Sequence, residues 1–431
     1  MNLKRALPVV FVLTLLSQPI LAGNGHMLHG FGPQNSSMGG AGAALPMDPV
    51  GEMMFNPALL SVEDGQSITF SSEFFKDDPQ FVVRMNDGRT GQAHPSTQIG
   101  ILPSFGWTWK KPGSNMAVGF GLVAMAGFRT DNPEDPGSIL FAAPPNGFGR
   151  IYTDYRVTRV PLEVAYQVTP EFSLGLAASA YIGELAIAPL PYKVYDSPGG
   201  NDNVRYYAQG GNLVSSMAYS FQLGFLYKLG DTMRVGGSYT TKQNFDPYTW
   251  NTTIADPNDP NYGKSRQLQY DLDGPMNGTL GVGWTPNDKV KVAADVMYIQ
   301  YHGVAGFGSP GGIVNRTVYP FGWRNVWVYK AGIEYKAMDG VRLRLGYNYS
   351  YIPIRHEVIL TGTGAPSLFK HHICVGVSVN ASDNLTADLG AYYSPKQSVT
   401  GPYPDLDGNQ VGIMTTSNSL KSVQLGLNWK F

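Results

Sequence analysis

The sequence predicts an all-β fold, a transmembrane antiparallel β-barrel of about 14 strands with an N-terminal hatch that plugs its lumen. Three observations lead to this prediction. Apolar residues alternate with small or polar residues in many stretches, short turn-forming links alternate with long polar segments, and the chain ends on an alternating stretch whose last residue is aromatic. The 52 Gly, 25 Tyr, 20 Phe and 7 Trp among 431 residues, with only 15% charged, are typical of a β-rich chain.

Residues 1–22 have the features of a secretory signal peptide. Lys4 and Arg5 precede an apolar run that is broken by two prolines, and Ala22 is the expected cleavage position. The alternative is a membrane anchor, but the apolar run is shorter than the roughly 20 residues that a spanning helix needs. We therefore expect an exported protein.

Charge and cysteine content exclude several classes of protein and site. Without Lys4 and Arg5 the mature chain has 29 basic and 32 acidic residues, so its net charge is −3 and it offers no basic excess to nucleic acid. A single cysteine, Cys374, excludes an intramolecular disulfide framework and a multi-cysteine metal site. We expect no cofactor, no metal and no nucleic-acid partner.

The expected barrel spans residues 67–431, and alternation is clearest in two of its stretches. From Met116 to Phe128 every second residue is apolar or small, as on a strand with one apolar face. The last stretch alternates from Val423 to Phe431. The expected strands begin near residues 67, 97, 115, 150, 171, 212, 232, 267, 288, 325, 341, 371, 384 and 420.

Short and long connections alternate strictly along the chain. KKPGS at Lys110 and KAMDG at Lys336 are short turn-forming links, whereas residues 189–211 and 243–266 are long polar segments. Outer-membrane barrels have short periplasmic turns on one side and long external loops on the other. A soluble sandwich has no reason to keep this asymmetry, and closure gives every strand amide a partner in lipid.

Aromatic residues carry two further expectations. A terminal Phe431 on an alternating strand resembles the assembly signal of outer-membrane proteins, so the barrel assembly machinery is an expected partner. Tyr and Trp near expected strand ends would form two girdles against outer-membrane lipids, although aromatic residues also simply favour strands. The expected girdle residues are Tyr298, Tyr301, Trp323, Trp327, Tyr329, Tyr335, Tyr347, Tyr349, Tyr392 and Tyr393.

Residues 23–66 differ from the rest of the chain. They do not alternate, and they are rich in Gly and Pro, which makes them too irregular for strands in lipid. With 44 residues the segment is too short to bury a core of its own. A large barrel leaves a lumen that must be wet or filled, so we expect this segment inside the barrel as a hatch.

The hatch sequence carries a family resemblance. GFGPQNSSMGGAGAALPMDPVGEMMFNPALL is similar to the start of the mature chain in the FadL, TodX and XylN (OmpP1) family of outer-membrane transporters for hydrophobic compounds. That family has an Asn-Pro-Ala motif, which Asn56, Pro57 and Ala58 match. Residues 323–353 are similar to later strands of the family. Size, strand number and terminal Phe agree along the whole chain, whereas the long loops match poorly.

The resemblance implies a function and a location. It implies passive uptake of hydrophobic molecules through the outer membrane of a Gram-negative bacterium, with long-chain fatty acids first and aromatic or alkane hydrocarbons second. The ligand would pass from a groove among the loops to an internal pocket, a hatch and a lateral opening in the wall. The alternative is a non-transporting surface or secretion-associated barrel, and a barrel lipase is more remote. We expect a monomer.

The hatch residues have two expected roles. Asn56 would cap or pin a turn, and Pro57 would fix the backbone beside it. Apolar hatch residues would line the ligand pocket, where methionine adapts to irregular ligands, although a hatch needs packing residues in any case. The expected lining residues are Phe31, Met38, Met47, Met53, Met54, Phe55, Leu59 and Leu60.

The resemblance also implies a wall opening beside a kinked third strand. Gly119 and Gly121 in the expected third strand weaken it locally, and Pro103 in the second strand has no amide to donate. Ordinary barrel curvature is the alternative explanation for all three residues.

Charged residues fall on the expected lumen face of several strands. With the apolar face outward, Asp295 and Glu334 point inward together with three cations. Such charges are usually structural bridges, but a cation could bind the head group of a carboxylate ligand. The possible carboxylate-binding residues are Lys330, Arg342 and Arg344.

Catalytic and metal patterns are weak. His371 and His372 are adjacent on an expected strand and so point to opposite faces. Nucleophile-elbow and zinc-helix motifs do not occur in the sequence, so we expect no enzyme. Asp405, Asp407 and Asn409 have calcium-like spacing, but the distal Glu of a calcium loop is missing.

Overall fold

The structure is a computed structural model that describes residues 23–95, 97–142, 148–191, 210–254, 260–308, 310–314 and 317–431. The expected signal peptide, residues 1–22, lies outside the described residues.

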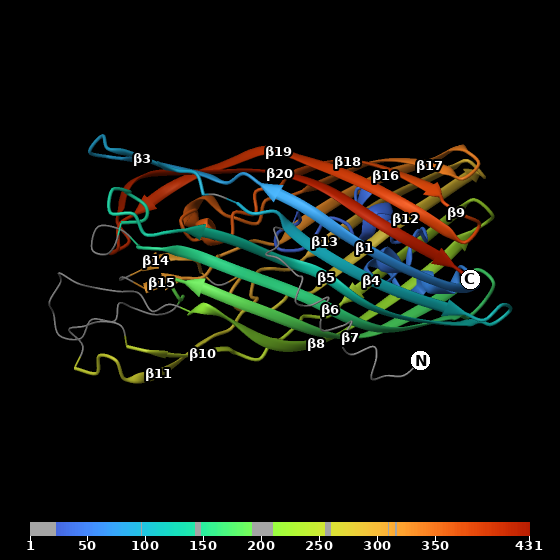
Figure 1. Cartoon of the computed structure of the whole chain (residues 1–431), viewed down its shortest axis with the longest axis horizontal. Helices are drawn as coiled ribbons and strands as arrows, with labels where there is room; N and C mark the ends of the chain where they lie inside the picture. Colours follow the sequence, from blue (N-terminus) through green and yellow to red (C-terminus); the bar gives the residue numbers. More distant parts are fainter. Residues whose placement is uncertain are drawn as a thin grey trace.

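Fourteen strands close into one antiparallel ring (Figure 1). Each ring strand pairs with the next one along the chain, and the last strand pairs with the first, which closes the ring. The predicted all-β class and the antiparallel barrel of about 14 strands are therefore confirmed. The ring strands are β1 (Gly65–Asp77), β4 (Gly100–Lys110), β5 (Met116–Asn132), β6 (Ile151–Gln167), β7 (Phe172–Ala188), β8 (Gly210–Leu229), β9 (Met233–Thr240), β12 (Asn277–Asn287), β13 (Val290–Ile299), β16 (Val326–Met338), β17 (Val341–Ser350), β18 (His371–Asn380), β19 (Leu385–Pro404) and β20 (Gln410–Lys430).

Side chains alternate across the wall. On β8, Met217, Tyr219 and Phe221 are exposed on the outer face, whereas Ser220 and Gln222 are buried toward the lumen. An apolar outer face suits a surrounding of hydrocarbon, and a closed ring leaves no strand edge there. No described helix has the length and apolar character that crossing a bilayer requires.

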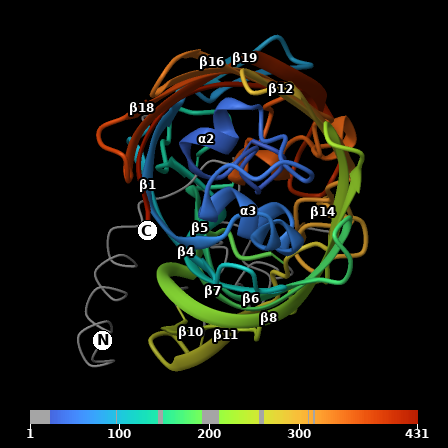
Figure 2. The same cartoon turned by 90° about the vertical axis from the view of Figure 1, so that its right-hand side faces the viewer.

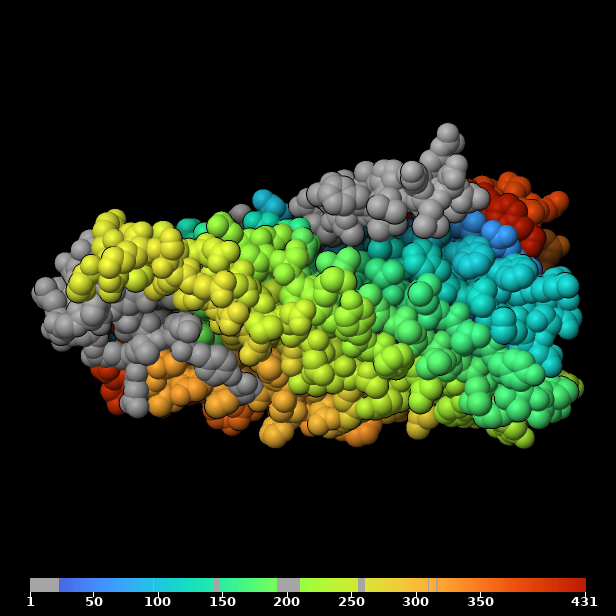
Figure 3. Space-filling model, turned by 90° about the horizontal axis from the view of Figure 1, so that it is seen from below, coloured from blue at the N-terminus to red at the C-terminus, as the bar shows by residue number. Residues whose placement is uncertain are grey.

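Two predicted strand starts are wrong. β12 begins at Asn277, because the stretch near residue 267 belongs to β11 (Ser265–Tyr270), which pairs with β10 (Tyr248–Thr253) in a loop hairpin. β20 begins ten residues earlier than predicted, because it continues to pair with β19 up to Gln410. Figure 1 shows this hairpin at the opposite end of the molecule from the C-terminus, and Figure 3 shows it in yellow.

The long connections contain the remaining short elements. β2 and β3 extend the sheet beyond β20, at the end opposite to the C-terminus (Figure 1). These elements are β2 (Gln80–Met85), β3 (Thr90–Ala93), β14 (Gly312–Val314), β15 (Thr317–Tyr319), η2 (His356–Val358) and η3 (Thr361–Gly364).

Residues 23–64, the internal segment, lie inside the ring. Figure 2 shows its helices α2 (Gly32–Ser37) and α3 (Pro49–Phe55) surrounded by the strands, and η1 (Pro57–Ser61) follows them. Nearly all of its residues are buried. Its Gly and Pro residues break it into these short pieces, because neither favours a long helix.

Lumen-facing glycines let the wall approach the internal segment closely. A Cβ added at Gly224 would lie 2.1 Å from Asn56 Oδ1, and one at Gly346 would lie 2.1 Å from Gly39 N. No side chain fits at these distances, so the segment is packed directly against the wall. Glycines in the same situation on other strands are Gly106, Gly119, Gly175, Gly236, Gly283, Gly332, Gly376 and Gly426.

Exposed aromatic residues lie near both ends of the ring strands. The end of the barrel at which the C-terminus lies has Trp109, Tyr166, Tyr227, Trp284 and Tyr335. The end at which the long loops lie has Trp327, Tyr329, Tyr347 and Tyr393. For Tyr301, Trp323 and Tyr392 the girdle prediction is wrong, because these side chains are buried. Tyr392 points inward because it precedes the outward Tyr393 on a strand, and the other two lie outside the strands and turn into the lumen.

Candidate functional site

Asn56 connects the internal segment to the wall. Its Nδ2 donates to the carbonyl oxygens of Ala43 (2.7 Å) and of Phe225 in β8 (2.8 Å), and its Oδ1 accepts from Ala58 N (3.0 Å). The side chain is fully buried, and Pro57 begins η1 directly after it. An asparagine amide supplies two donors and an acceptor, so this one side chain satisfies all three partners.

Asp295 and Lys330 are cross-strand partners that hold the loop before α3. Asp295 accepts hydrogen bonds from two backbone amides of the internal segment, at 2.8 and 3.0 Å. Lys330 Nζ donates to Gly40 O (3.2 Å) and lies 3.9 Å from the ring centroid of Phe55, which is a cation–π contact. Both charged side chains are buried. Their charges therefore bind the internal segment.

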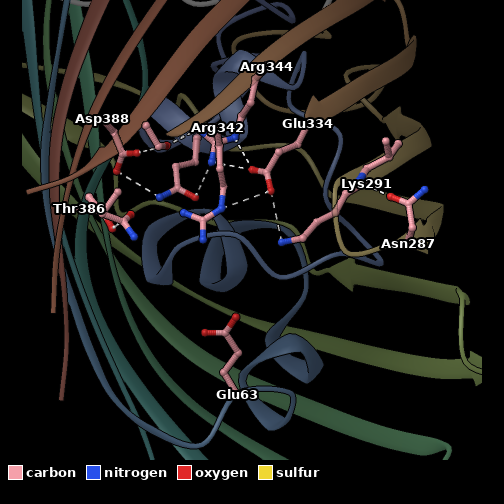
Figure 4. Close-up of polar contacts among 12 residues, drawn as sticks. Glu63, Asn287, Lys291, Glu334, Arg342, Arg344, Thr386 and Asp388 are labelled. Carbon is pink, nitrogen blue, oxygen red and sulfur yellow. Dashed lines mark hydrogen bonds and ion pairs between the residues drawn. The ribbon is translucent and has the colours of Figure 1, made fainter. Parts of the chain in front are cut away.

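Figure 4 shows a second group of charges, beside α2. Arg344 of β17 forms an ion pair with Glu334 of β16 (2.6 Å) and donates to Gln34 Oε1 of α2 (3.2 Å). Arg342 lies at the margin of this group, 4.0 Å from Glu334. Arg344, like Lys330, already has buried partners, so a ligand carboxylate would have to displace them.

A cavity of about 20 Å³ lies between the internal segment and the wall, and both apolar and polar residues line it. Phe31, Met54 and Phe55 line it from the segment, and Met125 and Arg159 line it from β5 and β6. Three of the eight predicted lining residues therefore come together here. The other five contact the wall or the segment elsewhere: Met38 and Met47 near Ala293, Leu59 near Leu226, and Met53 and Leu60 near Ala117 and Ala165.

Arg159 is the one charged residue among those that line the cavity in the described chain. Its Nε donates to Ser179 Oγ (2.9 Å) and its Nη2 to Gln222 Oε1 (2.8 Å). Glu163 Oε1 lies 3.7 Å from Nη2, beyond ordinary hydrogen-bond distance. A buried guanidinium whose nearest partners are neutral can bind a carboxylate.

The wall is interrupted between β4 and β5. Their pairing ends at Ser104 and Val123, so the rest of β5 has no partner in β4. β5 bulges at Met125, where its pairing with β6 shifts register. The internal segment takes the place of the missing partner, because Gly127 N donates to His26 O (2.9 Å). Since Met125 also lines the cavity, the gap and the cavity adjoin.

The predicted opening residues lie near this gap. Pro103 is the last residue of the part of β4 that lacks a β5 partner. Gly119 lies in the paired part of β5, and a Cβ added there would be 2.6 Å from Leu60. Gly121 is the next lumen-facing residue, and its Cβ would be 3.0 Å from Met53. Both glycines thus make room for the internal segment, whereas the break in pairing coincides with the bulge.

A cluster of aromatic rings lies beside the gap and reaches into the loops. His26 stacks on Phe307 (centroids 4.6 Å apart), and its Nδ1 lies 2.8 Å from Tyr301 Oη. A second cavity, which is mainly apolar and has a volume of about 50 Å³, is lined by Phe321 and by other residues of the loops and strand ends. Phe321 also packs in the cluster, so the rings connect the loops to His26. The other rings are Phe128, Tyr155 and Trp323.

The histidines and aspartates of the weak metal patterns have other partners. His371 Nδ1 lies 2.6 Å from Tyr347 Oη, whereas His372 stacks on His29 in the lumen. Asp405 accepts from two backbone amides of its own turn, at 2.9 and 2.8 Å. Among the residues that the structure describes, no group of three His, Cys, Asp or Glu could hold a metal ion.

Asp48 gives the internal segment a pH-dependent stability. Its carboxylate caps α3 by accepting from Gly51 N (3.0 Å), and burial raises its pKa from 3.8 to about 7. Between these two values the folded chain keeps a proton that the unfolded chain has lost, so the free energy of unfolding falls as pH rises through this window. We expect protection factors for amide exchange in residues 49–55 to be higher at pH 5 than at pH 8.

The control for this prediction is Asp48→Asn, which keeps an acceptor for the Gly51 amide but cannot ionise. Its protection factors are expected to depend less on pH, although burial also raises the pKa of Glu52 in the same helix. A pH difference of equal size in this variant would assign the effect to another group.

Comparisons with known proteins give the family. Residues 13–430 match the family model described as outer membrane protein transport protein (OMPP1/FadL/TodX). A comparison with curated proteins gives no match. The predicted family and the predicted outer-membrane location are confirmed.

Solved structures agree on the fold. The Pseudomonas putida toluene transporter TodX is 17% identical, with 96% of this chain and 100% of that chain covered and a TM-score of 0.69. A Pseudomonas aeruginosa FadL homologue is 15% identical, with 94% and 100% covered and a TM-score of 0.72. The Ralstonia pickettii toluene transporter TbuX is 19% identical, with 94% and 99% covered and a TM-score of 0.67. Because the family model spans nearly the whole chain, this protein belongs to the OMPP1/FadL/TodX family of outer-membrane transport proteins.

Proposed function

We propose that the protein is a passive outer-membrane channel for hydrophobic molecules, with long-chain fatty acids as its first substrate class and aromatic or alkane hydrocarbons as its second. One observation carries the proposal: a cavity lined by apolar side chains of the internal segment and by Arg159 of the wall adjoins the interrupted wall between β4 and β5. Apolar side chains would contact the hydrocarbon part of a fatty acid, and Arg159 would bind its carboxylate.

An apolar route is needed because such cargo does not cross a water-filled pore readily. Moving apolar surface into water costs about 25 cal/mol per Å². The rings from Phe321 to His26 offer apolar contacts between the loops and the cavity. From there the ligand would leave through the gap beside Met125 and enter the bilayer without crossing water.

In this proposal the internal segment acts as a hatch. A cavity of about 20 Å³ is much smaller than a fatty-acid chain, so side chains must move when a ligand enters. Met27, Met54 and Met125 line the cavity, and methionine adapts its shape more easily than branched side chains. The motion thus begins at the hatch residues that face Arg159.

Aromatic hydrocarbons form the second substrate class because the route is rich in rings. Stacked and edge-to-face contacts with Phe307 and Trp323 would hold an aromatic ligand. Structures similar to this chain include two toluene transporters, TodX and TbuX. The alternative is a non-transporting surface or secretion-associated barrel, whose lumen would stay tightly plugged. The close glycine contacts of the internal segment suit either function, so uptake must be measured.

The test compares entry of labelled oleate and labelled toluene into cells with and without the gene. We expect both ligands to enter faster in the presence of the protein, and oleate to depend on it more. Deletion of residues 23–60 is expected to let small polar solutes through as well, because it removes most of the internal segment. If each ligand enters cells that lack the protein as fast as cells that have it, the transport proposal is wrong.

Arg159→Met is expected to separate the two substrate classes. A charge-assisted hydrogen bond contributes about 1.5–3 kcal/mol, so oleate uptake at limiting concentration should fall roughly 10-fold to 100-fold. Toluene uptake should change little. Arg159→Lys keeps the charge and should retain part of the oleate uptake. Equal losses for both ligands would mean that Arg159 only holds Ser179 and Gln222 in place.

A further inference from the structure

Two lysines face each other on the outer wall. Lys76 of β1 is directly opposite Lys421 of β20, and both side chains are exposed on the outer face. Within the part of the chain that the structure describes, neither side chain has an ion pair or a hydrogen bond. Like charges directly opposite each other destabilise a pair of strands. This arrangement is therefore unfavourable unless an anion lies between the two ammonium groups.

The pair lies where the apolar part of the wall ends. Lys421 is ten residues before Phe431, which is about 34 Å along a strand and about 26 Å along the axis of a barrel tilted by about 40°. An apolar band on such barrels is about 25 Å tall. Outward residues from Val423 to Leu427 are apolar and exposed, and Tyr393 lies opposite Lys421 on β19. This height corresponds to the head groups of the outer leaflet.

The surroundings of the pair are mainly basic. Lys396, in the bulge of β19, is also exposed and donates to Gln80 of β2. Asp78, two residues after Lys76, is bound by His94 Nε2 at 2.5 Å. Of these charged residues three are lysines, and the one carboxylate already has a partner.

We infer that Lys76, Lys421 and Lys396 bind phosphate groups on the head group of an outer-leaflet lipid. A phosphate monoester carries a charge of about −1.5 to −2 at neutral pH and three acceptor oxygens, so one group can accept from both opposed ammonium groups. The apolar strip from Val423 to Leu427 would contact the acyl chains of the same molecule. Cations above an apolar strip match the two halves of a phosphorylated lipid.

The lysine site lies close to the wall gap, with β4 between them. β1 pairs with β20 on one side and with β4 on the other, and the gap lies along the far edge of β4. A lipid held at Lys76 would therefore border the exit of the proposed transport route. Binding itself depends only on the outer-membrane location and does not require transport.

The experiment titrates the purified full-length protein in detergent with bis-phosphorylated lipid A and follows binding by native mass spectrometry and thermal unfolding. The midpoint temperature of thermal unfolding of the wild type should rise with lipid A, because bound phosphate relieves the repulsion between the lysines. Lys76→Gln/Lys421→Gln should bind lipid A at least tenfold more weakly and show little rise. Lys111→Gln/Lys289→Gln, in turns at the opposite end of the barrel, serves as the matched control and should behave as the wild type.

Two further ligands identify the source of the phosphate. Dephosphorylated lipid A should bind the wild type as weakly as lipid A binds the double variant. Inorganic phosphate should not compete, since it has no acyl chains. Equal lipid A binding by the double variant and the wild type, or full competition by inorganic phosphate, would overturn the inference. The double variant should be at least as stable as the wild type without lipid, so a loss of folding would also contradict it.

Discussion

Asn56→Ala is expected to release the internal segment from the wall. The substitution removes three hydrogen bonds and leaves the carbonyl oxygens of Ala43 and Phe225 without these donors in a buried place. Each buried group without a partner costs about 1–3 kcal/mol. A loss of about 3 kcal/mol or more raises the local opening equilibrium roughly 100-fold. Amide exchange in residues 40–60 should accelerate by that factor, while exchange in the ring strands stays slow.

Two variants show which part of the Asn56 side chain matters. Asn56→Asp keeps the acceptor for Ala58 N but loses both donations, so it should open the segment at least as much as alanine. Asn384→Ala changes an exposed asparagine in a turn and should have no effect. Entry of small polar solutes into cells should rise with the Asn56 variants. If exchange in residues 40–60 stays at the wild-type rate, Asn56 does not hold the segment.

The ring could be predicted because its signal is local. Alternation depends only on neighbours two residues apart, and most strand starts follow from it directly. The same property explains the wrong start of β12, since the loop hairpin near residue 267 alternates as a wall strand does. Which hairpins continue the wall depends on partners far along the chain, which alternation does not report.

The position of the internal segment could be predicted by exclusion, but its contacts could not. Phe31 and Met54 meet at the cavity while Met38 packs near Ala293, although all three are apolar residues of one Gly-rich stretch. Their partners depend on how α2 and α3 are turned inside the ring. The glycines of the wall gave a usable signal, because a lumen-facing glycine such as Gly346 indicates close approach of another backbone.

Arg159 was missed, although the sequence contained a sign of it. It lies in the same alternating set as Glu163 and therefore on the same face of the strand. Two charges on the lumen face of a strand whose other face is apolar form the same pattern that indicated Lys330 and Arg344 as possible carboxylate-binding residues. In the fold, Lys330 donates a hydrogen bond to Gly40 and Arg344 forms an ion pair with Glu334. These partners depend on the three-dimensional arrangement and could not be read from the sequence.

Deletion of Met125 is expected to close the wall and stop uptake. Met125 is the extra residue of the bulge, since Ala124 pairs with Thr158 and Ala126 with the adjacent Val157. Without it β5 can continue in one register with β6 and extend its pairing with β4. The gap beside the cavity would then disappear. Uptake of both oleate and toluene should fall to the level of cells without the protein.

Met125→Ala separates the bulge from the side chain, because it keeps the chain length and removes only the side chain that lines the cavity. This variant should keep most of its uptake, since the part of β5 that has no partner in β4 remains. Amide exchange provides the structural check: backbone amides in residues 100–102 of β4 should become better protected in the deletion and not in the alanine variant. Normal uptake by a correctly assembled deletion variant would mean that cargo leaves by another path, because the pairing that it restores leaves no gap between β4 and β5.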